Sequence, residues 1–219
     1  MADYDIVRGT ATHFADWVFR KNNPNYQNAE HSSVVVNRKK LGQYAHVQID
    51  RIASHLNANN LATGISSNWK LVYADACTDM EARTFFASRL LVDGKPMRCR
   101  PDVVFRDEEK GIVVILERKT TTWEDSHVPP DAWPNVCAQL WCYGWIDDWA
   151  ANSDVILVCQ YYRMRIDWTY STAGVEIYQD EKSPWILNYE VLPAWQRSDN
   201  KLHTECLRYF SDYGGNFVH

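Results

Sequence analysis

Two carboxylates and a lysine lie in one stretch of the sequence at a spacing that suits metal chemistry. Asp102 follows Pro101, and Glu117 precedes Lys119 by two positions with Arg118 between them. Mg²⁺ is commonly held by one or two carboxylates together with phosphate oxygens. Such an ion polarises a phosphate and acidifies bound water, and a lysine beside it stabilises negative charge that develops at phosphorus. These residues therefore indicate metal-assisted chemistry on a phosphate ester.

The spacing also predicts that the three side chains share one face of a sheet. Alternate residues of a strand point to the same side, so Glu117 and Lys119 project together and Arg118 projects away. The polar turn 107–110 separates two strand-like runs. An antiparallel pairing around it with an odd register sum puts Asp102 on the face of Glu117, whereas a slip of one residue moves Asp102 to the other face.

The alternative interpretation is an exposed hairpin tip with scattered charges. The continuous apolar, largely β-branched run 112–116 counts against it, because that run predicts a buried strand. Burying charged groups without partners is costly. A bound metal or an ion pair would account for Glu117 and Lys119 at the end of such a strand.

The elements that must position these residues follow from turn signals and hydrophobic periodicity. Asp93-Gly94 predicts a hairpin turn between two strands. Helices are expected over 10–20, 38–56, 134–149 and 201–213, and strands over 69–73, 84–92, 96–105, 111–116, 154–162, 175–179 and 185–191. This order predicts an α/β fold with a central mixed β-sheet flanked by helices.

Two of the expected helices carry polar pairs at helical spacing. Gly42 and His46 form a GxxxH pattern, and Gln139 and Tyr143 form a QxxxY pattern. Residues four positions apart lie on one face of a helix, so each pair can present both members to the same neighbour.

The order GxxxH, Pro-Asp, Glu-x-Lys, QxxxY resembles the PD-(D/E)xK nuclease superfamily, and within it the RecB-like branch. Thr120 after the lysine also suits that branch. The resemblance extends from Gly42 to Tyr143, about half of the chain. It implies a restriction-endonuclease-like core within one nuclease domain over 1–219. The motif core would cover 38–165, with 1–37 and 166–219 as decorations.

The resemblance implies a metal-ligand set. His46, Asp102 and Glu117 would bind Mg²⁺ or Mn²⁺ through their side chains, and Arg118 through its backbone carbonyl. A further acidic residue often precedes the Pro-Asp in this branch. Glu81 is the candidate for that position, with Asp75 and Asp79 as competitors.

The resemblance also implies the catalytic roles. Asp102 and Glu117 would act through the metal, and Lys119 would serve the attacking water. Gln139 and Tyr143 would sit beside the site and position the lysine, the water or the nucleic acid. For the last pair, helix capping and packing is the alternative explanation.

The expected activity is metal-dependent hydrolysis of DNA phosphodiester bonds, as an exonuclease or in single-strand-end processing. Two alternatives remain open: an RNA endonuclease with the same metal site, and a catalytically silent binding protein of the same fold. The six cysteines are dispersed, so we expect buried reduced thiols and no iron–sulfur cluster. There is no helicase motif and no GKT or GKS phosphate loop.

Composition sets the remaining expectations. The net charge of −5 argues mildly against extended contact with duplex DNA. The high aromatic content mostly predicts core residues, with a few able to stack on unpaired bases. Neither a signal peptide nor a membrane-spanning run is seen, so a soluble cytoplasmic protein without membrane partners is expected. Its partner would be DNA, or RNA, and homo-oligomerisation is left open.

Overall fold

The computed structural model describes residues 7–25, 69–75, 83–121, 132–152, 154–164, 168–171, 174–177, 186–191 and 195–219. The helix expected over 38–56 lies outside these ranges, and so do His46, Asp79 and Glu81. None of the helices in the described ranges is both long enough and apolar enough to cross a membrane.

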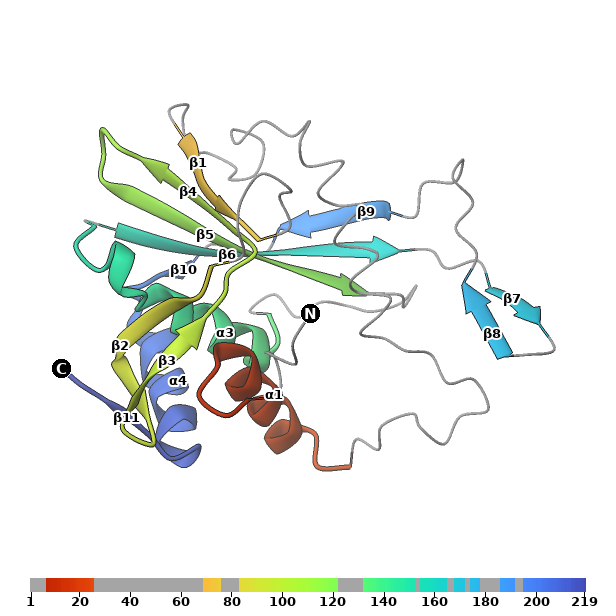
Figure 1. The fold of residues 1–219 in the computed structure, drawn as a ribbon, viewed down its shortest axis with the longest axis horizontal. Helices are drawn as coiled ribbons and strands as arrows, with labels where there is room; N and C mark the ends of the chain where they lie inside the picture. Colours follow the sequence, from red (N-terminus) through yellow and green to blue (C-terminus); the bar gives the residue numbers. More distant parts are fainter. Residues whose placement is uncertain are drawn as a thin grey trace.

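A mixed sheet forms the centre of the molecule (Figure 1). Among the described residues it has six strands, in the order β1-β4-β5-β6-β10, with β9 also paired to β6. Of the strand pairings described in this sheet, only β5–β6 is parallel. The strands are β1 (Trp69–Ala74), β4 (Val103–Asp107), β5 (Ile112–Thr121), β6 (Asp154–Met164), β9 (Ile186–Val191) and β10 (Trp195–Gln196). The expected α/β class with a mixed sheet flanked by helices is thereby confirmed.

Helix α3 (Pro134–Gly144) connects the two parallel strands, as a crossover between parallel neighbours requires. It begins with Pro134 in its first turn, where the missing N–H costs nothing. The prediction that this helix continues to residue 149 is wrong. It ends at Gly144, a poor helix former, and a separate short 3₁₀ helix, η4 (Asp147–Trp149), follows.

A smaller antiparallel sheet has the order β11-β2-β3, with β2 (Phe85–Val92), β3 (Lys95–Cys99) and β11 (Gly215–Phe217). The predicted hairpin turn is confirmed: Asp93 and Gly94 have φ of 52° and 73°, and Val92 pairs with Lys95. Both positive φ values match the two-residue hairpin turn that Asp-Gly favours. A separate two-stranded sheet contains β7 (Trp168–Ser171) and β8 (Gly174–Ile177).

The single strand predicted over 96–105 is also wrong. The structure divides it into β3 and β4, which belong to different sheets. Pro101 lies in the break and has no N–H to donate to a ladder, which explains why neither strand extends across it. The break places Asp102 immediately before β4, outside the regular pairing.

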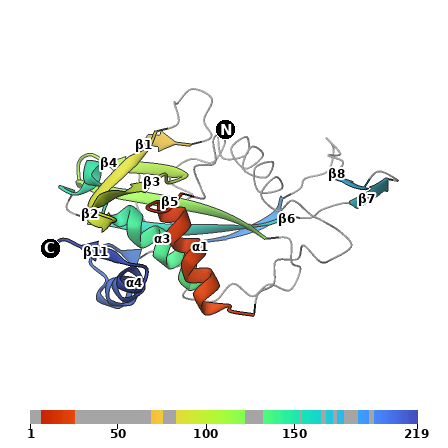
Figure 2. The same ribbon diagram turned by 60° about the horizontal axis from the view of Figure 1, so that its bottom comes forward.

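Helices α1 (Ala11–Asn22) and α4 (Asn200–Asp212) lie with α3 on one side of the large sheet (Figures 1 and 2). Each begins at a polar cap: Thr10 Oγ1 accepts from His13 N at 3.1 Å, and Asp199 Oδ1 accepts from Leu202 N at 2.9 Å. Buried residues of both helices join the cluster around α3. Parts of the segments 1–37 and 166–219 therefore help to build the core that supports α3.

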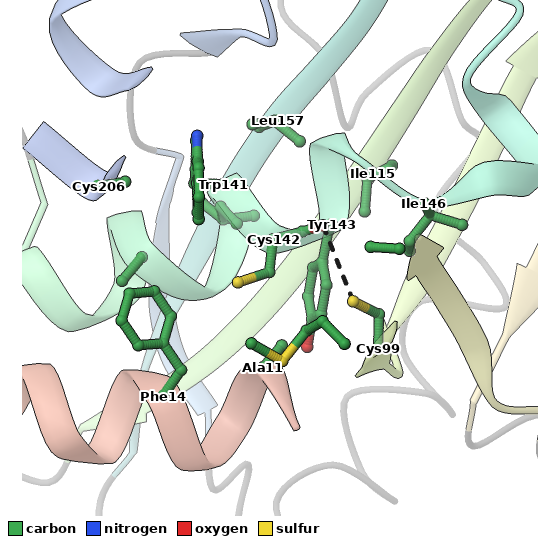
Figure 3. Close-up of a cluster of buried hydrophobic side chains, with 14 of the residues drawn as sticks. Ala11, Phe14, Cys99, Ile115, Trp141, Cys142, Tyr143, Ile146, Leu157 and Cys206 are labelled. Carbon is green, nitrogen blue, oxygen red and sulfur yellow. Dashed lines mark hydrogen bonds between the residues drawn. The ribbon is translucent and has the colours of Figure 1, made fainter. Parts of the chain in front are cut away.

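Aromatic and sulfur-containing side chains fill the space between α1, α3 and the sheet (Figure 3). Phe14 and Trp141 have ring centroids 6.4 Å apart. Cys99 and Cys142 are buried free thiols, and burial raises the pKa of both. Among the described residues, the expected burial of the cysteines is confirmed, except that Cys137 is only partly buried. This packing holds α3 against the sheet in one position.

The two faces of the sheet bury different residues. Val113 and Ile115 of β5 belong to the cluster beneath α3, whereas Val114 and Leu116 belong to a separate cluster on the other face. The alternation continues along the strand, so Glu117 lies on the α3 side.

Candidate active site

Asp102 and Glu117 are brought together by the register of β4 and β5. Val103 pairs with Leu116, so continuing the antiparallel register places Asp102 opposite Glu117. In agreement, Asp102 Oδ2 accepts a hydrogen bond from Arg118 N at 2.6 Å. The predicted odd register sum and shared face are confirmed. The Asp102 side chain thus accepts a hydrogen bond from the backbone N–H of Arg118, just beyond the last paired residues of β4 and β5.

Lys119 lies on the same face and contacts both Glu117 and α3. Its Nζ donates to Glu117 Oε1 at 2.6 Å and to Gln139 Oε1 at 2.8 Å. The predicted projection of Glu117 and Lys119 to one side is confirmed. Arg118 is also buried, at 4% exposure, and by alternation its side chain lies toward the opposite face.

Gln139 and Tyr143 continue this network across α3. Gln139 Nε2 donates to Glu117 Oε1 at 2.9 Å and to the Tyr143 hydroxyl at 2.7 Å. The Tyr143 hydroxyl donates to the backbone oxygen of Arg100 at 3.0 Å. The network therefore runs from β5 through α3 to the segment that precedes β4, and it brings together both members of the QxxxY pair and the Glu-x-Lys triplet.

The side chains of this hydrogen-bond network are buried, except that of Lys119, which is partly exposed. Glu117, Gln139 and Tyr143 are 4%, 5% and 1% exposed, whereas the Lys119 side chain is 29% exposed. Buried polar groups must be paired to be tolerated, and the bonds above pair most of these. The partly exposed Lys119 side chain marks the side from which a ligand can approach.

Burial and neighbouring charges shift the pKa values of Asp102 and Lys119 in different ways. Burial raises the pKa of Asp102 to about 6, although Lys119 and the Arg118 N–H act in the opposite direction. Burial lowers the pKa of Lys119, but attraction to Glu117 and Asp102 outweighs that effect and the net shift is upward. Lys119 is therefore an ammonium ion at neutral pH. Burial and the two nearby carboxylates raise the pKa of Tyr143, which remains a protonated donor.

Three residues were candidates for the further acidic position before Pro101, and of these only Asp75 falls within the described residues. Its N–H donates to Asp102 O at 2.8 Å, and Oδ1 accepts from Arg100 Nε at 2.5 Å and from the Tyr73 hydroxyl at 2.7 Å. Asp75 thus adjoins Asp102, with its carboxylate engaged by Arg100 and Tyr73. No local sequence pattern indicates this contact, because Asp75 and Arg100 are joined only by the pairing of β1 with β4.

Two carboxylates of the site are of the chemical type that binds hard divalent cations. Asp102, just before β4, and Glu117, on β5, carry carboxylate oxygens, the ligand type that Mg²⁺ and Mn²⁺ prefer. Within the described ranges there is no group of three or more His, Cys, Asp or Glu that could hold a metal. His46 and Glu81, the other predicted side-chain ligands, lie outside those ranges.

Comparisons with known proteins leave the family open. No family model matches the sequence, and no curated protein matches it. The solved structure "Crystal structure of SSO0001" is similar over 93% of this chain and 73% of its own, with 15% identity and a TM-score of 0.38. A TM-score that low does not establish a common fold. Any assignment of function therefore depends on the residues of the site themselves.

Proposed function

We propose that this protein is a Mg²⁺- or Mn²⁺-dependent nuclease that hydrolyses DNA phosphodiester bonds at strand ends or in single strands. It would belong to the RecB-like branch of the PD-(D/E)xK superfamily, with a restriction-endonuclease-like core. The observation that carries the proposal is the bonded set Glu117–Lys119–Gln139–Tyr143, with Asp102 held beside it by Arg118 N. Separate motifs supply these residues, and the fold brings them into contact.

Asp102 and Glu117 would hold the metal, together with His46 and the Arg118 carbonyl. When bound, the ion would supply Lewis-acid activation of the phosphate and of the attacking water. Lys119 is an ammonium ion and so acts as a hydrogen-bond donor, not as a general base. Its place is to orient the water and to stabilise the charge that develops on the phosphate oxygens.

Gln139 would be a positioning residue. Its carbonyl oxygen accepts from Lys119 while its NH₂ group donates to Glu117 and Tyr143, so one amide orients the cation and the carboxylate together. A glutamate here would add a third negative charge beside Asp102 and Glu117. Tyr143 in turn is anchored on the Arg100 carbonyl, which ties the amide to the segment that carries Asp102.

The decisive experiment is a cleavage assay with the purified full chain and Mn²⁺. Substrates of one sequence would be offered as single-stranded DNA, blunt duplex DNA and RNA, each labelled separately at its 5′ and 3′ ends. We expect cleavage of single-stranded DNA or duplex ends, abolished by Asp102→Asn. Cleavage confined to RNA would overturn the DNA assignment while retaining the site. The absence of metal-dependent cleavage on every substrate would overturn the nuclease proposal.

A further inference from the structure

The segment that carries Asp102 lies between two sheets and is not itself part of a strand. β3 ends at Cys99 and β4 begins at Val103, so residues 100–102 lie between the ladders of the two sheets. A carboxylate that ligates a metal must be held within about 0.5 Å of its productive position. Contacts other than regular strand pairing must therefore fix this segment.

Contacts from β5 and α3 hold the segment on two sides. Arg118 N donates to Asp102 Oδ2 at 2.6 Å, and the Tyr143 hydroxyl donates to Arg100 O at 3.0 Å. Neither bond comes from β1, the strand that pairs with β4 on its other side (Figure 1). Support from that side depends on the residue that follows β1 in the chain.

Asp75, the residue after β1, contacts the segment twice. Its N–H donates to Asp102 O at 2.8 Å. Its Oδ1 accepts from Arg100 Nε at 2.5 Å, an ion pair in which both side chains are 25% exposed. One residue thus holds the backbone of Asp102 and the side chain of Arg100, on either side of Pro101.

Tyr73 sets the orientation of the Asp75 carboxylate. Its hydroxyl donates to Asp75 Oδ1 at 2.7 Å. Burial, and then the bond to Asp75, raise the pKa of Tyr73 to about 12, so the hydroxyl remains a protonated donor at neutral pH. The tyrosine is 4% exposed, and its ring packs edge-on against Phe85 with centroids 5.0 Å apart. The carboxylate is therefore anchored on a side chain of the core.

The same contacts bear on which role the Asp75 carboxylate has. The PD-(D/E)xK resemblance made Asp75 a competitor for the position of a further metal ligand. A carboxylate oxygen has two lone pairs, and those of Oδ1 are both used by Arg100 and Tyr73. The paired guanidinium also offsets the negative charge that would attract a cation. These contacts favour a residue that positions a ligand over one that binds the metal itself.

We propose that Asp75 is a positioning residue for Asp102, which fixes Arg100 and the Asp102 backbone and so presents the Asp102 carboxylate to the metal without binding the metal itself. This rests on the proposed nuclease function. Mutation of the groups that orient metal ligands typically costs about 10–100-fold in metal affinity or activity. Loss of the Asp75–Arg100 link should therefore be measurable at the metal centre.

The first arm of the test needs no activity and measures backbone hydrogen exchange in the metal-free protein by NMR. The Arg118 N–H donates to Asp102 Oδ2, so its exchange rate reports the position of that carboxylate. Asp75→Ala should speed this exchange about tenfold, as loss of one hydrogen bond predicts. The N–H of Ile115, in the middle of β5, should keep its protection and so show that the variant folds.

Two further variants of the ion pair separate its geometry from its charge. Arg100→Met keeps the apolar stem but removes the donor to Asp75, and it should speed the Arg118 exchange as Asp75→Ala does. Asp75→Asn keeps an oxygen that can accept from Arg100 and Tyr73, and it should exchange as the wild type does. Combining Asp75→Ala with Arg100→Met should add little to either change alone, because both break the same link.

The second arm measures single-turnover cleavage against substrate concentration, beside Mn²⁺ titration by calorimetry. Asp75→Ala and Arg100→Met should lower the maximal rate about 10–100-fold and leave the substrate concentration at half-maximal rate unchanged. Asp75→Asn should retain both the rate and the Mn²⁺ affinity of the wild type. Lys70→Ala is the matched control, because it removes an exposed ion pair with Glu108 near the other end of β1.

Faster Arg118 exchange with slower cleavage in both Asp75→Ala and Arg100→Met, and wild-type behaviour of Asp75→Asn, support the proposal. Unchanged Arg118 exchange, or undiminished cleavage, in Asp75→Ala overturns it. An equal loss of Mn²⁺ affinity in Asp75→Asn and Asp75→Ala also overturns it and makes Asp75 a ligand. The nuclease proposal fails separately: the expected exchange in a protein that cleaves no substrate would retain the link from Asp75 to Asp102 and remove that function.

Discussion

Lys119 Nζ donates to Gln139 Oε1 across 2.8 Å and so joins the end of β5 to the middle of α3. The two residues are twenty positions apart and belong to different elements. The same amide contacts Glu117, so the orientation of Gln139 is set from two sides. The lysine and the carboxylate of the Glu-x-Lys triplet are consequently held in one geometry by a residue of another motif.

Lys119→Ala is expected to abolish cleavage and to leave metal binding largely intact. Removing one donor that stabilises developing charge costs about 10²–10³ in turnover, and this lysine would also orient the water. The measurement is single-turnover cleavage with Mn²⁺, beside Mn²⁺ titration by calorimetry. Lys95→Ala, an exposed lysine of β3, is the control and should cleave as the wild type does. Undiminished cleavage by Lys119→Ala would remove the lysine from the mechanism.

Tyr143→Phe and Gln139→Ala should slow cleavage about a hundredfold, because misplacement of a catalytic group by roughly 1 Å has effects of that size. Tyr143→Phe also leaves the Arg100 carbonyl without that donor and should cost about 1–2 kcal/mol of stability. Thermal melting and single-turnover rates would be measured together.

Tyr209→Phe separates stability from positioning in that comparison. It removes a tyrosine hydroxyl that bonds Asn22 Oδ1 at 3.1 Å, remote from the lysine. We expect a similar decrease in stability without the decrease in rate. If both tyrosine variants reduced the rate equally, Tyr143 would have only a structural role.

Asp102→Asn should stabilise the metal-free protein at high pH. The pKa of Asp102 is about 6 in the folded state, above its ordinary value of 3.8. An unfolded chain therefore loses this proton first, and ionisation favours unfolding as the pH rises from about 4 to about 6. Above pH 6 the cost is complete, at most about 3 kcal/mol.

The test for this cost is melting in EDTA at several pH values. Asparagine can still accept from Arg118 N, so the variant should melt above the wild type at pH 8, and the gap should close near pH 4. Asp16→Asn, which removes only an exposed ion pair with Arg20, should change stability by less than about 1 kcal/mol at either pH. A wild type that is the more stable protein at pH 8 would contradict the prediction.

Mn²⁺ should raise the melting temperature of the wild type. At a hundred times its dissociation constant, a ligand that binds only the folded state adds about 2.7 kcal/mol. Glu117→Gln and His46→Ala should each reduce that gain, since each removes a proposed ligand. Glu108→Gln, an exposed residue of the β4–β5 turn, should retain it. Equal stabilisation of all variants would place the metal elsewhere on the protein.

Local patterns in the sequence were enough to predict much of the fold. Helices were expected at the positions of α1 and α4, Asp93-Gly94 marked the hairpin, and apolar patterns marked most strands. Side-chain alternation along β5 was equally predictable, so the i, i+2 spacing alone assigns Glu117 and Lys119 to one face. These features depend on residues close together in the chain, whose preferences are expressed within one element.

Tertiary structure decided the rest. The division of 96–105 into β3 and β4 depends on which sheet each half joins, and that is a contact between distant segments. The register Val103–Leu116 placed Asp102 opposite Glu117, and a shift by one residue would have separated them although the sequence stayed the same. Asp75 reached Arg100 only through the pairing of β1 with β4. The sequence by itself determined which residues could do this chemistry. Packing of α3 against the sheet determined that these residues come into contact, because the contacts join separate elements that no local preference can bring together.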